Sequence, residues 1–147
     1  MRSTVADLLG IGARVDALRA IEAGDTSPEL FDVVGDAWDI DTRAEHALRQ
    51  AGLQGIELGR EVGTLSGGES MLVAIAGLWL AAAPITLLDE PTNNLDRDAR
   101  RRLYDMVRAW PGTLLVVSHD PALLELMDTT AELRENRITL FGGPLSE

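Results

Sequence analysis

The chain has 147 residues, of which 46% are hydrophobic, and this is enough for one domain with a hydrophobic core. Its formal net charge of -11 argues against a nucleic-acid-binding surface on this chain, because phosphate backbones require clustered cations. The absence of cysteine excludes disulfides and thiolate metal sites, and it is compatible with a cytoplasmic protein. All 13 basic residues are arginines, so any mechanism that requires a lysine in this chain is excluded.

Residues 1–63 are expected to form a mainly helical region. Apolar residues recur at helical spacing in two stretches, one over about 15–21 and the other over about 44–51. Glycine and proline residues separate these stretches, as expected between helices. Asp41 or Thr42 is expected to cap the second helix, because both residue types are favoured at the N-cap position.

An uncharged, mostly apolar stretch over 71–88 has the length of a membrane span. Pro84 would break a continuous helix near its end, and the flanking residues are acidic, whereas arginine or lysine usually flanks a membrane helix. We therefore expect no membrane span. The stretch instead predicts a buried helix over about 67–82, a turn, and a buried strand over about 85–89.

From about residue 64 onwards, apolar strands alternate with helices. The pattern predicts strands over 85–89 and 113–118, helices over about 97–110 and 121–127, and two short strands around the turn at 135–136. Continuous apolar strands of this kind are typical of a parallel sheet that is buried on both faces. The fold class is therefore α/β. Two clear parallel strands are few, so the rest of the sheet comes from elsewhere or one edge is exposed.

The segment Leu-Ser-Gly-Gly-Glu opens the helix over 67–82. Ser66 followed three residues later by Glu69 is a capping box, which is a common structural device. The glycines Gly67 and Gly68 are more than a cap requires, and they would let an anion approach the amide groups at the positive end of the helix. Both interpretations, a cap alone and an anion site, remain open from this segment by itself.

Polar side chains follow the two apolar strands. Asp89 and Glu90 end the first strand, and His119 comes just after the second. Ligands bind at the carboxyl ends of strands in open α/β sheets, where a carboxylate can hold Mg²⁺, a neighbour can activate water and a histidine can bind phosphate. Strands that simply end in solvated polar residues are the structural alternative. Asp96 is expected to be the N-cap of the helix that begins at Arg97.

Together these segments closely resemble an ATP-binding cassette (ABC) ATPase. LSGGE at 65–69 matches the signature loop, ITLLDE at 85–90 the Walker B strand, NNLD at 93–96 the D-loop, and VVSHD at 116–120 the switch-histidine strand. NNLD after DEPT, with glutamate in the signature loop, resembles the ABC-F class, whose members are soluble twin-cassette ATPases that often act at ribosomes.

The resemblance covers essentially the whole chain and implies an incomplete P-loop NTPase fold. Residues 1–63 would be the helical subdomain of the cassette, and residues 64–147 the C-terminal part of the ATPase core, with a partial parallel sheet. In this resemblance Asp89 would hold Mg²⁺ through water, Glu90 would be the catalytic base and His119 would contact the γ-phosphate.

The resemblance also implies a partner. The signature loop would contact the γ-phosphate of a nucleotide held by a second cassette, through the residues Ser66, Gly67, Gly68 and Glu69. Asp96 would communicate across that dimer interface. Leu72 replaces a basic residue that is usual in the family, and Pro121 replaces an arginine that is frequent there, which puts the dimer contacts in doubt.

The Walker A loop, G-x-x-x-x-G-K-[ST], is absent from this sequence, and its lysine has no counterpart. We therefore expect a fragment of an ATPase that does not bind ATP and Mg²⁺ tightly or hydrolyse ATP by itself. The missing strands should leave apolar surface, so self-association is expected. Two alternatives remain open: the ATP-binding subunit of a membrane transporter, and a truncated cassette that serves only as an interaction module.

Overall fold

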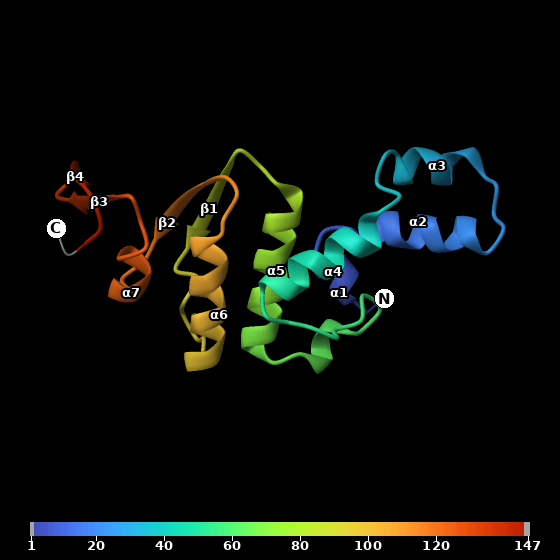
Figure 1. Cartoon of the computed structure of the whole chain (residues 1–147), viewed down its shortest axis with the longest axis horizontal. Helices are drawn as coiled ribbons and strands as arrows, with labels where there is room; N and C mark the ends of the chain where they lie inside the picture. The colour runs from blue at the N-terminus through green and yellow to red at the C-terminus, as the bar shows by residue number, and fades with distance from the viewer. Residues whose placement is uncertain (1, 146–147) are drawn as a thin grey trace. The chain divides into compact units, whose positions relative to one another are not determined.

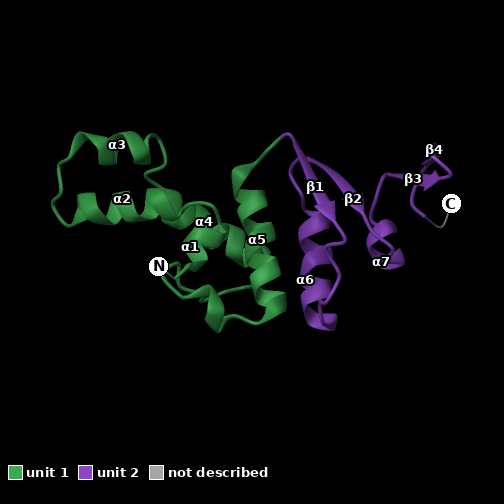
Figure 2. Cartoon of the chain, turned by 180° about the vertical axis from the view of Figure 1, so that it is seen from behind, with its two compact units in different colours: residues 1–83 green, residues 84–147 purple. Residues whose placement is uncertain are grey.

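The computed structural model describes residues 2–145, and these fold into two compact units that divide between Ala83 and Pro84 (Figures 1 and 2). The first unit contains α1 (Val5–Leu8), α2 (Gly12–Glu22), α3 (Pro28–Val34), α4 (Ile40–Gln50), the short 3-10 helix η1 (Val62–Thr64) and α5 (Gly67–Ala81). The second contains β1 (Ile85–Asp89), α6 (Arg97–Arg108), β2 (Thr113–Val117), α7 (Pro121–Leu124), β3 (Thr129–Arg134) and β4 (Arg137–Gly142).

This element order confirms the α/β class and the mainly helical first part. The predicted helix over 67–82 and strand over 85–89 agree with α5 and β1 to within one residue. The predicted division of the family fold between residues 63 and 64 stays a prediction. In the structure, the compact first unit also includes α5.

The core of the first unit lies where α5 contacts α1 and α4. Its fully buried side chains include Val5, Ile40, Leu72 and Val73. Gly77 allows the close approach of α5 to the turn after α1, because a Cβ atom at this position would lie 2.8 Å from the carbonyl oxygen of Leu9. A glycine is therefore required here by packing rather than by backbone conformation.

The predicted cap of α4 is wrong. The helix begins at Ile40, so Asp39 occupies the N-cap position and its side chain makes no capping hydrogen bond. Asp41, one of the two predicted caps, lies inside the first turn. The helix begins earlier because Ile40 is fully buried, and an earlier start places this apolar residue in the core.

In the second unit, β1 and β2 form a parallel pair in which Leu87 lies opposite Leu115 and Asp89 opposite Val117. Helix α6 connects them, as a parallel pair requires. It begins at its predicted cap, since Asp96 Oδ1 accepts a hydrogen bond of 2.8 Å from the amide of Ala99.

Only one face of this sheet is buried, so the predicted burial on both faces is wrong. Thr86 and Leu88 are buried, whereas Leu87 is 67% exposed and Leu115 is 58% exposed. Side chains alternate between the faces of a strand, and no described element covers the face on which Leu87 and Leu115 lie. The exposed face agrees with the apolar surface that was expected from the sequence.

The last two strands, β3 and β4, form an antiparallel hairpin, and its turn residues Glu135 and Asn136 both have positive φ angles, 49° and 59°. A two-residue turn in which both residues have positive φ angles matches the twist of the flanking strands. The hairpin confirms the predicted pair of strands. Helix α7 is shorter than predicted because the amides of Leu126 and Met127 bond three residues back, which ends the regular helix. Among the described residues, no helix has the length and hydrophobicity needed to cross a bilayer.

Candidate functional site

The two parallel strands bring Glu90 and His119 together at their carboxyl ends. The amide of Glu90 donates a hydrogen bond of 2.7 Å to the carbonyl oxygen of Val117, which continues the ladder one residue beyond β1. His119 follows β2 by two residues, and its Nε2 lies 3.5 Å from Glu90 Oε1. Sheet pairing therefore joins two residues that are 29 positions apart in the sequence.

The backbone of Glu90 leaves the strand abruptly. Its φ angle is 47°, a left-handed conformation that is unfavourable for a residue with a side chain. The following turn is held by a hydrogen bond of 3.2 Å from the amide of Asn93 to the Glu90 carbonyl, and the side chain of Thr92 is buried. Such conformations cluster at functional sites because a fixed backbone there aims a side chain.

The acidic and basic groups of this site differ in exposure. The Glu90 side chain is 25% exposed, whereas the His119 side chain is 97% exposed and open to a ligand. Asp89 is exposed as well. A partly buried carboxylate beside an exposed imidazole is suited to act on a bound phosphate, with the carboxylate receiving a proton from water and the imidazole donating a hydrogen bond.

Asp89 fits a magnesium ion only if a phosphate contributes further oxygen ligands. The described residues contain no group of three or more side chains that could hold a metal. Mg²⁺ is commonly bound by one or two carboxylates together with waters and substrate phosphates. Asp89 ends β1 and is exposed, so it can supply one such carboxylate.

Asp96 acts first as a structural residue. Besides capping α6 through Ala99, it follows a turn in which Asn94 has a φ angle of 61°. Arg100 Nε donates a hydrogen bond of 3.2 Å to the carbonyl oxygen of Leu95, which ties this turn to the first turn of α6. Its predicted role across a dimer interface stays a prediction.

The signature loop lies in the first unit and forms the predicted capping box. Ser66 Oγ accepts a hydrogen bond of 3.1 Å from the amide of Glu69, and Glu69 Oε1 accepts one of 2.9 Å from the amide of Ser66. A Cβ atom added at Gly67 would meet nothing within 4 Å, so open space surrounds this position. The cap is confirmed, and the free approach to the amino end of α5 is compatible with an anion site.

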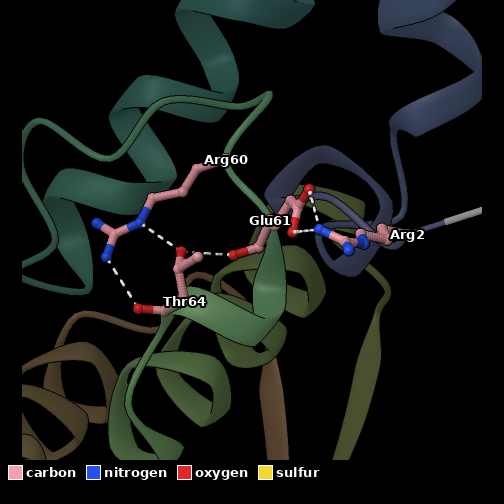
Figure 3. Close-up of polar contacts among 4 residues, drawn as sticks. All are labelled: Arg2, Arg60, Glu61 and Thr64. Atoms are coloured by element: carbon pink, nitrogen blue, oxygen red, sulfur yellow. Dashed lines mark hydrogen bonds and ion pairs between the residues drawn. The ribbon is translucent and has the colours of Figure 1, made fainter.

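The sequence analysis did not predict the hydrogen-bonded turn over residues 60–64, which precedes the signature loop (Figure 3). Arg60 donates hydrogen bonds to both the hydroxyl and the carbonyl oxygen of Thr64, at 2.9 and 3.1 Å. Thr64 Oγ1 donates a hydrogen bond to the carbonyl oxygen of Glu61. The two carboxylate oxygens of Glu61 both accept from the same nitrogen of Arg2, Nη1. These contacts fix the backbone immediately before Leu65 and Ser66. Exposed arginines on loops give no sequence signal for such partners.

Asp120, the residue after His119, makes two side-chain contacts. Asp120 is the N-cap of α7, and its Oδ1 accepts a hydrogen bond of 3.0 Å from the amide of Ala122. The contact from the Tyr104 hydroxyl to the other carboxylate oxygen of Asp120 was not foreseen. Burial raises the pKa of Tyr104 to about 12, helped by the hydrogen bond to Asp120 and its charge and opposed by Arg100.

Comparison with known proteins decides the family. The family described as "ABC transporter" matches residues 4–93, which is more than half of the chain. The chain belongs to this ABC family. The match includes the signature loop together with Asp89 and Glu90, and it ends before Asp96 and His119.

ABC proteins of different kinds are similar to this chain. The energy-dependent translational throttle protein EttA of Mycobacterium tuberculosis (strain ATCC 25618 / H37Rv) is 34% identical over 143 residues, covering 90% of this chain and 25% of EttA. The lipoprotein-releasing system ATP-binding protein LolD of Anaeromyxobacter dehalogenans is 41% identical over 102 residues, covering 67% of this chain and 42% of LolD. The chain thus spans less than half the length of either relative.

Solved ABC structures share the fold. An inward-facing metal-chelate type ABC transporter has a TM-score of 0.65 at 21% identity, covering 97% of this chain and 53% of its own. The dimeric, ADP- and phosphate-bound cassette MJ0796 has a TM-score of 0.60 at 23% identity, covering 86% of this chain and 55% of its own. The chain therefore has the fold of an ABC ATPase domain, and it spans about half the length of each of these two chains.

Proposed function

We propose that this chain is the signature- and Walker B-bearing part of an ABC-F-type ATPase, and that its parent protein hydrolyses ATP. The observation that carries the proposal is the Glu90–His119 pair, 3.5 Å apart at the carboxyl ends of two parallel strands. Ligands bind at this end of an open α/β sheet.

Each residue of the pair has a separate role. Glu90 orients the attacking water and receives its proton, since its carboxylate is partly buried and held by a fixed backbone turn. The ring of His119 is almost fully exposed, so a bound nucleotide can reach it, and it donates a hydrogen bond to the γ-phosphate. Asp89 would hold Mg²⁺, and the ion would neutralise charge on the phosphates.

The signature loop serves a second nucleotide. Ser66 caps a 15-residue helix that begins with Gly67 and Gly68, and Glu69 completes this cap. The positive end of the helix favours an anion. We assign this loop to the γ-phosphate of ATP on a second cassette, with Asp96 at the interface between the two. The dimeric state of the similar cassette MJ0796 supports such a partner.

The ABC-F assignment rests on the NNLD loop and on the similarity to EttA, which extends over 90% of the chain. The name of that relative refers to translation, which supports the ribosome as a partner of the parent protein. The similarity to LolD supports a second candidate, the ATP-binding subunit of a transporter. A second cassette encoded in the same reading frame favours the first, and a neighbouring membrane permease gene favours the second.

The chain alone is expected to be inactive. Phosphoryl transfer depends on positioning and charge neutralisation, and the chain has no lysine to contact the phosphates. Calorimetry with ATP and Mg²⁺ should therefore detect no binding to this chain at millimolar nucleotide. Micromolar binding would show that arginine or a second copy supplies the missing contacts.

The catalytic assignment is tested in a chimera in which this chain replaces the matching part of a cassette of EttA. Glu90→Gln should lower the rate of ATP hydrolysis by about 10²-fold or more, because it removes a general base while keeping the shape of the side chain. ATP binding should persist.

Glu132→Gln, on the exposed hairpin strand β3, is the matched control and should leave the rate unchanged. An active Glu90→Gln chimera would refute the assignment of Glu90. A chimera that binds ATP but is inactive even with Glu90 intact would refute the proposed function.

A further inference from the structure

His119 is placed by its backbone and not by packing of its ring. Its side chain is 97% exposed, and the one polar contact that the described residues provide to it is Glu90, at 3.5 Å. An exposed imidazole is free to rotate away from a partner at this distance. Whatever keeps the ring beside Glu90 must therefore act on the turn at Ser118, His119 and Asp120.

Asp120 fixes this turn from both sides. Its amide donates a hydrogen bond of 2.9 Å to Ser118 Oγ, which closes the turn around His119. One oxygen of its carboxylate accepts from the amide of Ala122, and the other accepts from the hydroxyl of Tyr104. A helix cap requires only the first of these two carboxylate contacts. The second contact comes from a different element, α6.

Helix α6 provides a fixed support for this contact. Its residues Leu103 and Met106 are fully buried, and Val107 is 7% exposed, so packing of these side chains anchors the helix. Tyr104 lies beside them and is partly buried, with its hydroxyl at Asp120. Its raised pKa means that the phenol keeps its proton, and remains a donor, throughout the physiological range.

We propose that Tyr104 is a positioning residue for His119: its hydroxyl holds Asp120, Asp120 fixes the turn, and the turn keeps the imidazole beside Glu90. We call this set of contacts from Tyr104 through Asp120 to the turn the clamp. Its importance for hydrolysis rests on the proposed function. The clamp itself is a property of this chain without nucleotide, so it can be tested even though the chain alone is expected to be inactive.

The test uses NMR on the full chain, which has only two histidines, His119 and His46 in the other unit. In the unsubstituted chain, Glu90→Gln should shift the ring signals of His119 and leave those of His46 unchanged. In a Tyr104→Phe background the same Glu90→Gln change should no longer shift His119. Exchange of the Asp120 amide should also become about fivefold faster, the effect expected from loss of one hydrogen bond.

Two further variants separate the clamp from simple effects on folding. Asp120→Ser keeps a good helix cap but is too short to reach Tyr104, and it should reproduce the loss of the His119 response. Thr130→Val deletes a hydroxyl elsewhere in the same unit, where Thr130 bonds to Gly143, and it should leave His119 unchanged.

The proposal is overturned if His119 still responds to Glu90→Gln after Tyr104→Phe, or if Thr130→Val abolishes the response equally. Because these measurements require no ATP, their failure would leave the assignment of Glu90 in hydrolysis untouched. Conversely, an inactive chimera would leave the clamp intact.

Discussion

At the scale of single residues, the second unit places three ionisable side chains, Glu90, Tyr104 and Asp120, around the loop that carries His119. Two of the contacts involved, Glu90 to His119 and Tyr104 to Asp120, join residues that are distant in sequence. Sheet pairing brings the first pair together in space, and helix packing brings the second pair together. Their consequences can be measured one side chain at a time.

The stability of the chain should depend on pH above 9 through Tyr104 alone. The chain has no lysine or cysteine and one tyrosine, and arginine stays protonated there. The folded state holds the phenol proton more tightly than the unfolded state, so its pKa rises from 10.0 to about 12. The free energy of unfolding should therefore fall as the pH rises from 10.0 to about 12.

Urea unfolding, followed by circular dichroism between pH 9 and 12, measures this decline. In Tyr104→Phe the decline should be absent, because no other side chain titrates in this interval. An equal decline in both proteins would show that Tyr104 does not hold its proton more tightly when folded.

At the scale of elements, α5 illustrates two different constraints on small residues. Gly77 lies in the middle of the helix, where the backbone of Leu9 approaches it. Ala82 lies just after its end, where the chain takes a left-handed conformation with a φ angle of 51°. The first position requires the absence of a side chain for space, and the second favours its absence for backbone conformation.

Gly77→Ala should destabilise the first unit by about 1–3 kcal/mol, because the new methyl group would overlap the Leu9 backbone, which cannot rotate away. Thermal unfolding of the variant measures the change. Gly63→Ala is the matched control, since open space surrounds that position, and it should change stability little. Equal stability of both variants would mean that α1 and α5 separate at no cost.

Ala82→Gly should stabilise the chain by about 1 kcal/mol, since glycine removes the cost of a left-handed conformation at the end of a helix. The adjacent change Ala81→Gly, inside the last turn of α5, should destabilise it by about 0.5–1 kcal/mol. Opposite signs in urea unfolding are the expected result. Destabilisation by both would show that Ala82 is not held in this conformation in solution.

At the scale of the whole molecule, the chain is an ABC ATPase domain that spans about half the length of the cassette MJ0796. Its parallel sheet has one buried face and one exposed apolar face that includes Ile85, Leu87, Leu115 and Val117, all more than half exposed. Exposed apolar patches of this kind favour association. The negative net charge opposes it, so association should strengthen with salt.

We expect this sheet face to cause self-association of the isolated chain. Replacing the cross-strand neighbours Leu87 and Leu115 with threonine preserves strand propensity and reduces the apolar area. Sedimentation velocity should detect a shift toward monomer in this double variant. Leu140→Thr on the exposed face of the hairpin is the control and should shift the distribution less. A monomeric unsubstituted chain would refute this expectation.

The sequence by itself determined most of the secondary structure, the family motifs and the caps at Ser66 and Asp96. These features follow from local rules, because periodicity, capping residues and strand-ending carboxylates act over a few neighbouring positions. Local rules failed at α4, where burial of Ile40 moved the start of the helix. Tertiary packing there outweighed the preference of Asp41 for a cap.

Only the tertiary structure decided which residues meet. The register of β1 and β2 sets the Glu90–His119 distance, and the packing of α6 brings Tyr104 to Asp120. The exposure of one sheet face could not be predicted from the sequence either, because a continuous apolar strand has the same pattern whether one face or both faces of the sheet are covered. Contacts between distant residues depend on how elements pair and pack, and that information lies in the folded chain as a whole.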